Sequence, residues 1–321
     1  MAVQAPAVEE RSAISWRRVK DRTSARLFLG LSLFPLAITT AMVLVLAAKA
    51  RPILAGRSIL ELLTGRTWLP LEGQFGFFPF IMGTLWVTVL AMLLAVPPAL
   101  FTAIYLAEYA RPRTKAAAKP LVDILAAIPS VVYGIWGVIA IVPFVGATLS
   151  PWLGSRFGFI PLFATDNPTG YSVFAGSLVL GLMVVPVIIA ISYEVIASVP
   201  DGLREAALAL GTTRWQVIRH AVLPKAFPGI AAAVVLAFSR AFGETMAVLM
   251  VVGNVPRVPA SVFDPAYPLP ALIANNYGEM MSIPLYDSAL MGAALVLLLV
   301  VLLFNIVSAL ILRSAVRRAA A

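Results

Sequence analysis

Long apolar runs alternate with shorter polar segments along the whole chain. Each run is long enough to cross a membrane, because about 20 helical residues at ~1.5 Å each span a hydrocarbon core of roughly 30 Å. The predicted spans cover residues 27–48, 75–109, 120–145, 172–199, 222–252 and 288–312. The pattern therefore predicts an all-α polytopic membrane protein with six transmembrane helices.

Prolines and turn-forming residues add detail to this plan. The second run is longer than one crossing needs and contains Pro97 and Pro98, which remove backbone donors, so we expect a bent helix. Residues 146–171 and 253–286 have a turn-forming composition and are expected to be outer loops. The expected divisions are a basic tail at 1–26, a first helix and outer loop at 27–74, a membrane domain at 75–313 with a polar loop at 200–224, and a tail at 314–321.

Composition supports a bilayer environment. Of 321 residues, 61% are hydrophobic and 12% are charged, whereas soluble domains have about 45–50% apolar and about 25% charged residues. The chain has no cysteine, which excludes disulfides and thiolate chemistry. Its single histidine, His220, leaves little scope for a histidine-based metal site or proton relay.

Basic residues are unevenly distributed between the two sides that six spans create. The side with both termini carries 17 lysines and arginines, and the other side carries 6. This excess predicts that both termini and the loop at 200–224 are cytoplasmic. The net charge of +9 comes from residues that flank the spans, so it does not indicate nucleic-acid binding. The first run lacks a clean cleavage site, which favours an uncleaved span over a signal peptide.

The loop at 200–224 is polar and lies between two apolar runs. Asp201 is expected to cap a new helix through its carboxylate. Gly211 is expected to end that helix in the left-handed conformation. Thr213 and Gln216 match a capping box, which predicts the start of a second helix. The loop is therefore predicted to be a helix, a glycine turn and a second helix.

The first of these helices has an apolar stripe, while Arg204 and Glu205 are expected to face elsewhere. The stripe has the helical spacing i, i+3, i+4 and i+7, at Leu203, Ala206, Ala207 and Leu210. On this pattern alone, the loop is either an amphipathic connector on the membrane surface or a docking element for a cytoplasmic partner.

The same segment resembles the EAA loop of ABC-importer permeases. The residues that match, at the spacing of the family, are Glu205-Ala206-Ala207, Gly211 and Leu223-Pro224. Ala221 stands where the family has isoleucine, which loosens one apolar contact. In the family this loop forms the coupling helix that fits a groove on the ATPase subunit. The resemblance implies that the residues of this contact are Glu205, Ala206, Ala207 and Gly211.

Two opposite charges lie within the fifth run. Arg240 and Glu244 are four residues apart, so on a continuous helix they share a face and are able to pair. Each costs roughly 2.5–3.5 kcal/mol near the bilayer centre, and such residues normally face a cavity or another helix. Either the pair fixes helix packing, or Arg240 binds an oxyanion through its fork of donors while Glu244 holds it in place.

A second resemblance concerns these charges. The sequence RAFGETMAV at 240–248, with VGN at 252–254 and AAIPSVVYGIWG at 126–137, resembles phosphate-specific importer permeases of the PstC type. The similarity covers most of residues 75–313. It implies a type I ABC importer permease (MetI-like) fold, with Arg240 and Glu244 on the substrate pathway. The related PstA-type permeases tend to have Ala-Pro after GET, where this chain has Met-Ala-Val.

The resemblance also implies partners and a location. They are a PstA-type permease in a heterodimer, two copies of a PstB-type ATPase, a PstS-type phosphate-binding protein that is periplasmic or lipid-anchored, and the lipid of a bacterial inner membrane. The chain has no GxxxxGK[ST] loop. We therefore expect a transport subunit that is not an enzyme and holds no metal or cofactor, with ATP and magnesium on the partner ATPase.

Other functions were weighed against this one. Import of sulfate, molybdate or tungstate remains open, although phosphate carries a proton at neutral pH that Glu244 is suited to accept. A membrane-embedded enzyme is disfavoured because the chain has no GxSxG elbow and no HExxH motif. A channel is disfavoured because it needs no coupling helix.

Three other carboxylates lie near the expected cytoplasmic ends of spans. For Glu108, Asp123 and Glu194 we expect solvation at the interface or pairing with basic loop residues. Tyr133 and Trp136 either line a pathway or pack between helices.

Overall fold

The computed structural model describes residues 7–164, 166–279 and 282–320, so Met1 to Pro6 and Ala321 of the expected tails lie outside it. The described chain is mainly helical and divides into two compact units, at residues 1–49 and 50–321. Within the described residues, six helices are long and apolar enough to cross a membrane. They cover Lys20–Gly56, Phe78–Tyr109, Ser130–Phe157, Val173–Ala197, Arg214–Phe242 and Tyr286–Leu310.

The first unit consists of most of α1, which runs over Ala7–Gly56. The helix begins well before the expected span at residue 27 and includes much of the polar segment that precedes it. Hydroxyl groups along it donate to carbonyl oxygens four residues earlier, as Thr39 does to Pro35 at 3.0 Å and Thr40 to Leu36 at 2.8 Å. These bonds satisfy polar side chains without help from water, as a bilayer requires.

The second unit begins with a short segment of mixed structure. It contains α2 (Ile59–Thr64), β1 (Trp68–Leu69), the 3₁₀ turn η1 (Pro70–Glu72) and β2 (Gln74–Phe75). The two strands pair antiparallel, with Trp68 opposite Phe75. Phe77 and Phe80 pack beneath this hairpin against Tyr286, where the last span begins. The aromatic cluster therefore joins the second and sixth spans at the hairpin end of the unit.

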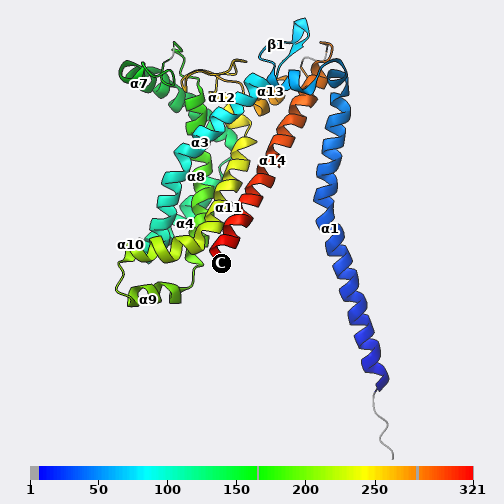
Figure 1. The fold of residues 1–321 in the computed structure, drawn as a ribbon, viewed down its shortest axis with the longest axis vertical. Helices are drawn as coiled ribbons and strands as arrows, with labels where there is room; N and C mark the ends of the chain where they lie inside the picture. The colour runs from blue at the N-terminus through cyan, green and yellow to red at the C-terminus, as the bar shows by residue number, and fades with distance from the viewer. Residues whose placement is uncertain (1–6, 165, 280–281, 321) are drawn as a thin grey trace, which may run out of the picture. The chain divides into compact units, whose positions relative to one another are not determined.

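The membrane helices form the body of this unit (Figure 1). The second span is α3 (Phe78–Ile104) with a π-helical turn η2 (Tyr105–Tyr109), followed by α4 (Pro112–Ala127). The third consists of α5 (Ser130–Trp136), η3 (Gly137–Ile141), α6 (Val142–Phe144), η4 (Val145–Leu149) and α7 (Ser150–Phe157). The fourth is α8 (Val173–Ala197), and the loop after it contains α9 (Asp201–Ala209). The remaining elements are α10 (Arg214–Val217), η5 (Ile218–Val222), α11 (Leu223–Phe242), α12 (Met246–Val251), α13 (Leu269–Asn276) and α14 (Tyr286–Ala320).

Besides the first span, the third and the fifth have clearly different limits in the structure, and the third continues to Phe157 through residues expected to belong to an outer loop. The third begins at Ser130, because Pro129 separates it from α4, which is a helix of its own without buried residues. The fifth begins at Arg214 and ends at Phe242, so it includes the capping box and stops ten residues early. Local proline chemistry explains the first difference, and a helix break discussed below explains the second.

Widened π-helical turns accompany three of the prolines. The turns η3, η4 and η5 directly precede the helical segments that begin with Pro143, Pro151 and Pro224 at their second position. A proline lacks the backbone N–H and collides with the carbonyl of the preceding turn, and a wider turn relieves both problems. The helices therefore continue through these prolines instead of breaking.

Small residues let the central helices approach closely. The core between α3, α8 and α11 contains Ala91, Ala95, Ala99, Ala237 and Ala241. A Cβ on Gly181 of α8 would lie 3.3 Å from the Ala91 carbonyl oxygen. Such small residues are typical of helix contacts in membranes, where dispersion and not exclusion of water drives packing.

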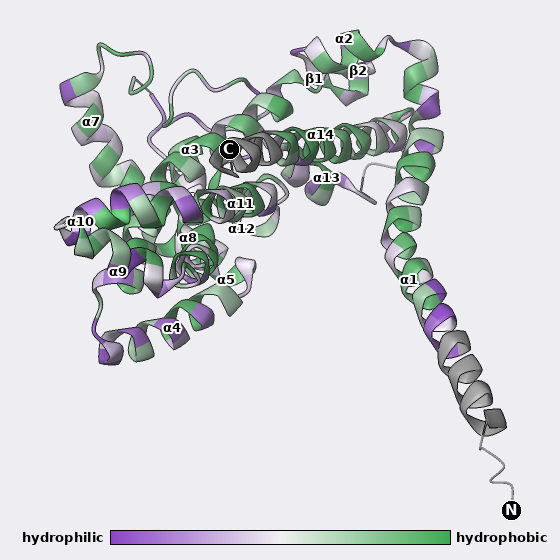
Figure 2. Ribbon diagram, turned by 60° about the horizontal axis from the view of Figure 1, so that its bottom comes forward, coloured by the Kyte–Doolittle hydropathy of each residue, from purple (hydrophilic) through white to green (hydrophobic). Residues whose placement is uncertain are grey.

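The unit has two different ends. The hairpin, α7, α12 and α13 lie at one end, and α9 and α10 lie at the other, where α14 also finishes (Figure 1). Hydrophilic residues gather on α4, α9 and α10, whereas most of α14 is hydrophobic (Figure 2).

Candidate functional site

The loop between the fourth and fifth spans has the predicted local shape. Gly211 has φ +77°, the left-handed conformation expected after a helix end. The Thr213 hydroxyl accepts from the Gln216 backbone N–H at 3.4 Å, and the Gln216 side chain accepts from the Thr213 N–H at 2.8 Å. The glycine turn and the capping box are therefore both confirmed.

The expected role of Asp201 is wrong. Pro200 occupies the cap position of α9 without a side-chain bond, and Asp201 is the first residue of the helix. Its carboxylate instead accepts from Arg204 Nη1 at 3.1 Å. An acidic residue in the first turn still interacts favourably with the positive end of the helix.

The structure shows which side of α9 faces the rest of the protein. Arg204 and Ala207 are the two partly buried residues of this helix, so they form the side that contacts the rest of the protein. Leu203 and Leu210 of the expected stripe are exposed, and the exposed fraction of Leu210 is 84%. Glu205 and Ala206 are exposed as well. Three of the four stripe residues are thus exposed, and the fourth, Ala207, attaches the helix together with Arg204.

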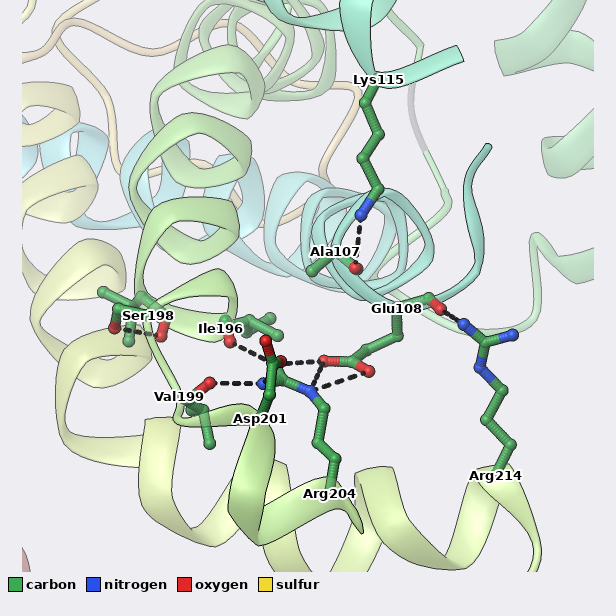
Figure 3. A network of polar contacts seen from close by, with 10 residues as sticks. Ala107, Glu108, Lys115, Ile196, Ser198, Val199, Asp201, Arg204 and Arg214 are labelled. Atoms are coloured by element: carbon green, nitrogen blue, oxygen red, sulfur yellow. Dashed lines mark hydrogen bonds and ion pairs between the residues drawn. The ribbon is translucent and has the colours of Figure 1, made fainter. Parts of the chain in front are cut away.

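Arg204 forms an ion pair with Glu108 at the end of the second span (Figure 3). Its Nη2 lies 2.8 Å from Glu108 Oε1, and its Nε lies 3.2 Å from the same oxygen. The exposed fractions of the side chains are 18% for Arg204 and 7% for Glu108. A pair so well shielded from water is held more firmly than an ion pair at an exposed surface.

The guanidinium of Arg204 also caps the end of the fourth span by binding backbone carbonyls there. Nη2 donates to the Ile196 carbonyl at 3.0 Å, and Nη1 donates to the Val199 carbonyl. With the bonds to Glu108 and Asp201, each of the five N–H groups of the guanidinium has an acceptor. The hydrogen bond with Glu108 raises the pKa of Arg204 above its ordinary value, so the charge persists at every physiological pH.

A second arginine reaches the same place from α10. Arg214 Nη2 donates to the backbone carbonyl of Glu108, and its guanidinium carbon lies 5.0 Å from the centre of the Tyr109 ring. Lys115 Nζ donates to the Ala107 carbonyl at 2.9 Å. Basic side chains therefore satisfy the free carbonyls at the end of η2, where the helix dipole is negative (Figure 3).

The other two carboxylates have different surroundings. Glu194 pairs with Lys119 at 2.6 Å, and both side chains are about 60% exposed, at 59% and 61%. Asp123 is exposed on α4. Pairing with a basic loop residue is confirmed for Glu194 and Glu108, but Glu108 is buried and not at a solvated interface.

The fifth span is interrupted between its two charged residues. Arg240 lies in the last turn of α11, Gly243 ends that helix, and Glu244 precedes α12. The spacing of four residues therefore does not bring the two side chains to one face, and they form no ion pair among the described residues. The expectation of a helical Arg–Glu pair is corrected, and Gly243 in the sequence was the available signal.

The two charges consequently face different parts of the molecule. Arg240 is exposed on the surface of the bundle. Glu244 is half-buried, and its Oε1 accepts weakly from the Ala247 N–H at 3.5 Å. Thr84 and Thr88 of α3 line the same narrow crevice as Glu244. In the described part of the chain, no three acidic or histidine side chains gather closely enough to hold a metal ion.

Known proteins with similar sequences are transport subunits. The phosphate transport system permease protein PstC of Mesorhizobium japonicum is 38% identical over 245 residues, which cover 75% of this chain and 74% of that protein. The PstC protein of Xylella fastidiosa is 35% identical over 291 residues, with coverages of 87% and 89%. A probable ABC transporter permease, YqgH of Bacillus subtilis, is 38% identical over 277 residues, with coverages of 85% and 84%.

Solved structures with a similar fold are ABC importers. An inward-facing form of the MetNI methionine ABC transporter aligns with a TM-score of 0.52 at 20% identity, over 73% of this chain and 93% of that chain. A bacterial ABC transporter involved in the import of the acidic polysaccharide alginate aligns with a TM-score of 0.55 at 17% identity, with coverages of 93% and 99%. The likeness confirms the MetI-like permease fold.

The family assignment rests on a match over well over half of the chain. A family model described as "Binding-protein-dependent transport system inner membrane component" matches residues 99–320. Its members are multi-pass inner-membrane proteins that work with a separate ATPase and a substrate-binding protein, and they are not enzymes. The chain therefore belongs to the binding-protein-dependent transport system inner membrane component family, the membrane subunits of ABC importers.

Proposed function

We propose that this chain is the permease subunit of an ATP-driven phosphate importer and that Arg240 and Glu244 lie on its substrate pathway. The observation that carries the proposal is the state of Arg240. Its guanidinium belongs to a membrane-spanning helix, is exposed on the bundle surface, and has no carboxylate partner among the described residues. A permanent charge in that position requires an aqueous pathway, an anion or a partner subunit.

The chemistry of Arg240 suits an oxyanion. Its planar fork of donors matches two oxygens of a phosphate group, whereas hydrocarbon has no hydrogen-bond acceptor for it. The helix ends just beyond Arg240, and interrupted helices are a common way to form a binding site within a membrane. Because Glu244 forms no ion pair with Arg240 among the described residues, it leaves the guanidinium available for the substrate.

Glu244 is suited to a second task at the same break. At neutral pH phosphate carries a proton. Its O–H group donates a hydrogen bond, which a carboxylate accepts. Sulfate and molybdate lack this proton and would place their negative charge against the carboxylate. In this proposal Arg240 attracts the anion, and Glu244 favours an anion that carries a proton. The names of the PstC relatives support the choice of phosphate.

The proposal also covers the orientation of the chain and its partners. Transport is assigned to residues 75–313, with both termini and the α9–α10 end on the cytoplasmic side. The ATPase contact consists of the exposed Glu205 and Ala206, with Ala207 and Gly211 setting their position. The second permease is a PstA-type homologue in a heterodimer, two PstB-type ATPases bind below, and a PstS-type binding protein delivers phosphate at the opposite end.

Uptake of radiolabelled phosphate tests this function. A strain that lacks the gene should lose high-affinity uptake and regain it when the gene is restored. Unlabelled arsenate should compete because it has the same shape and proton, whereas sulfate and molybdate should not. Competition by sulfate or molybdate would contradict the choice of phosphate, and unchanged uptake without the gene would contradict the whole proposal.

A further inference from the structure

Both helices of the α9–α10 loop are attached to one residue of the second span, Glu108. Arg204 of α9 binds its carboxylate, with the shortest distance 2.8 Å, and Arg214 of α10 binds its backbone carbonyl. These arginines are 96 and 106 residues away from Glu108 in the sequence. The contacts are therefore long-range attachments between the loop and the membrane helices.

A glutamate is an unexpected residue at this position. Helix C-termini carry partial negative charge, so a carboxylate in the last turn is unfavourable unless a cation compensates it. Glu108 is also buried, which increases the cost of leaving its charge unpaired. Capping of the helix end needs only Lys115 and Arg214, which bind backbone carbonyls and make no use of the carboxylate. The carboxylate of Glu108 is therefore not needed to cap its own helix.

Little else fixes α9 to the protein. Ala207 is its only partly buried apolar residue, and it packs against a cluster that includes Ala103 of α3 and Ile196 of α8. A single alanine offers a small contact area, so α9 depends on the four N–H groups of Arg204 that bind residues outside the helix. Those groups reach the end of the second span and the end of the fourth span together.

We propose that Glu108 is the positioning residue that fastens both helices of the coupling loop to the second and fourth spans, so that a displacement of α9 moves α3 and α8 with it. The inference rests on the proposed function, because it gives Glu108 a role in coupling to the ATPase. The two spans pack closely against each other and against α11, which carries Arg240. Through Glu108, the loop therefore acts on the helices beside Arg240 as well as on α11 itself.

The test compares Glu108→Gln with Glu194→Gln. Both substitutions remove one carboxylate charge at the same end of the bundle, but the Glu194–Lys119 pair is exposed and does not involve the loop. Glu108→Asp is the conservative variant, because it keeps the charge on a shorter side chain. All are made in the full chain and purified in the assembled transporter.

The first readout is the mobility of the loop, which does not depend on the substrate. The chain has no natural cysteine, so a nitroxide label at Leu210→Cys reports on the end of α9. Glu108→Gln should add a mobile component to the spectrum, Glu108→Asp should restore much of the original one, and Glu194→Gln should leave it unchanged. An unchanged spectrum in Glu108→Gln would overturn the inference.

The second readout is the number of phosphate ions imported per ATP hydrolysed. Glu108→Gln should bind the ATPase and hydrolyse ATP, yet its transport per ATP should fall about tenfold, within the usual range of coupling between sites. An equal loss of hydrolysis and uptake would mean that Glu108 only stabilises the fold, and would overturn the inference. If the unmodified transporter imports no phosphate, the proposed function fails, whereas the label at residue 210 still decides the role of Glu108.

Discussion

Arg240 and Glu244 are close in the sequence but have different surroundings in the structure. The helix ends between them at Gly243, so Arg240 stays on the exposed surface and Glu244 lines a crevice beside Thr84. An arginine that pairs within its own helix contributes to packing and nothing more. An arginine without such a partner keeps its donors for a ligand, which is why the break matters for function.

Replacing Arg240 tests whether this residue binds the substrate. Arg240→Gln removes the charge and should lower phosphate uptake by ~10- to 100-fold, since a hydrogen bond to a charged group is worth about 1.5–3 kcal/mol. Arg240→Lys keeps the charge but loses the fork, and should retain partial uptake. Uptake in membrane vesicles is the measurement, with the amount of permease checked by immunoblot. Normal uptake by Arg240→Gln would leave this arginine with a packing role only.

At the scale of elements, α9 is a helix with two different sides. The inner side contacts the rest of the protein through Arg204 and Ala207. The outer side carries Glu205 and exposed leucines. Leu203, Ala206 and Leu210 of the predicted stripe lie on the outer side, and Ala207 lies on the inner side. An exposed apolar surface on a short polar helix is the expected character of a docking contact.

A charge reversal on the outer side of α9 tests the docking surface. Glu205→Arg should reduce copurification of the ATPase by at least about tenfold, because it places a larger side chain of the opposite charge in the proposed contact. Glu72→Arg, an exposed reversal in the hairpin at the other end of the unit, serves as the control. The permease should reach the membrane in both variants. Retention of the ATPase by Glu205→Arg would place the docking surface elsewhere.

At the scale of the second unit, the two ends differ in structure. The charged loop lies at one end, the hairpin and α7 lie at the other, and the interrupted fifth span connects them. From Arg214 to Arg240 the helix covers roughly 40 Å at 1.5 Å per residue. If the proposed function holds, we expect a movement of the loop to reach the proposed substrate position along α11 and, through Glu108, along the helices that pack beside it.

Orientation in the membrane is the prediction that belongs to this scale. Leu71, in the hairpin, is 89% exposed, and Leu210, in the loop, is 84% exposed. In the cysteine-free chain, a membrane-impermeant maleimide should label Leu71→Cys in spheroplasts and label Leu210→Cys only after permeabilisation. The reverse pattern would contradict cytoplasmic termini and a cytoplasmic coupling loop.

Local sequence alone determined a large part of this protein. Apolar runs set the number of membrane helices, because a helix satisfies all of its backbone groups within one segment and so can cross lipid. The turn at Gly211 and the capping box at Thr213 were predictable, since each depends on residues that are neighbours in the chain. The position of basic residues likewise led to a prediction of sidedness without any three-dimensional information.

Other features were decided only by tertiary structure. The attachment of Arg204 and Arg214 to Glu108 joins residues about a hundred positions apart, which no local pattern encodes. The end of α11 allows α12 to pack against α5 so closely that a Cβ on Gly134 would lie 3.2 Å from the Ala247 Cα. That packing separates Arg240 from Glu244, although helical spacing predicted a pair. Sequence thus fixes which charges enter the membrane, and the contacts between helices decide which of them remain free.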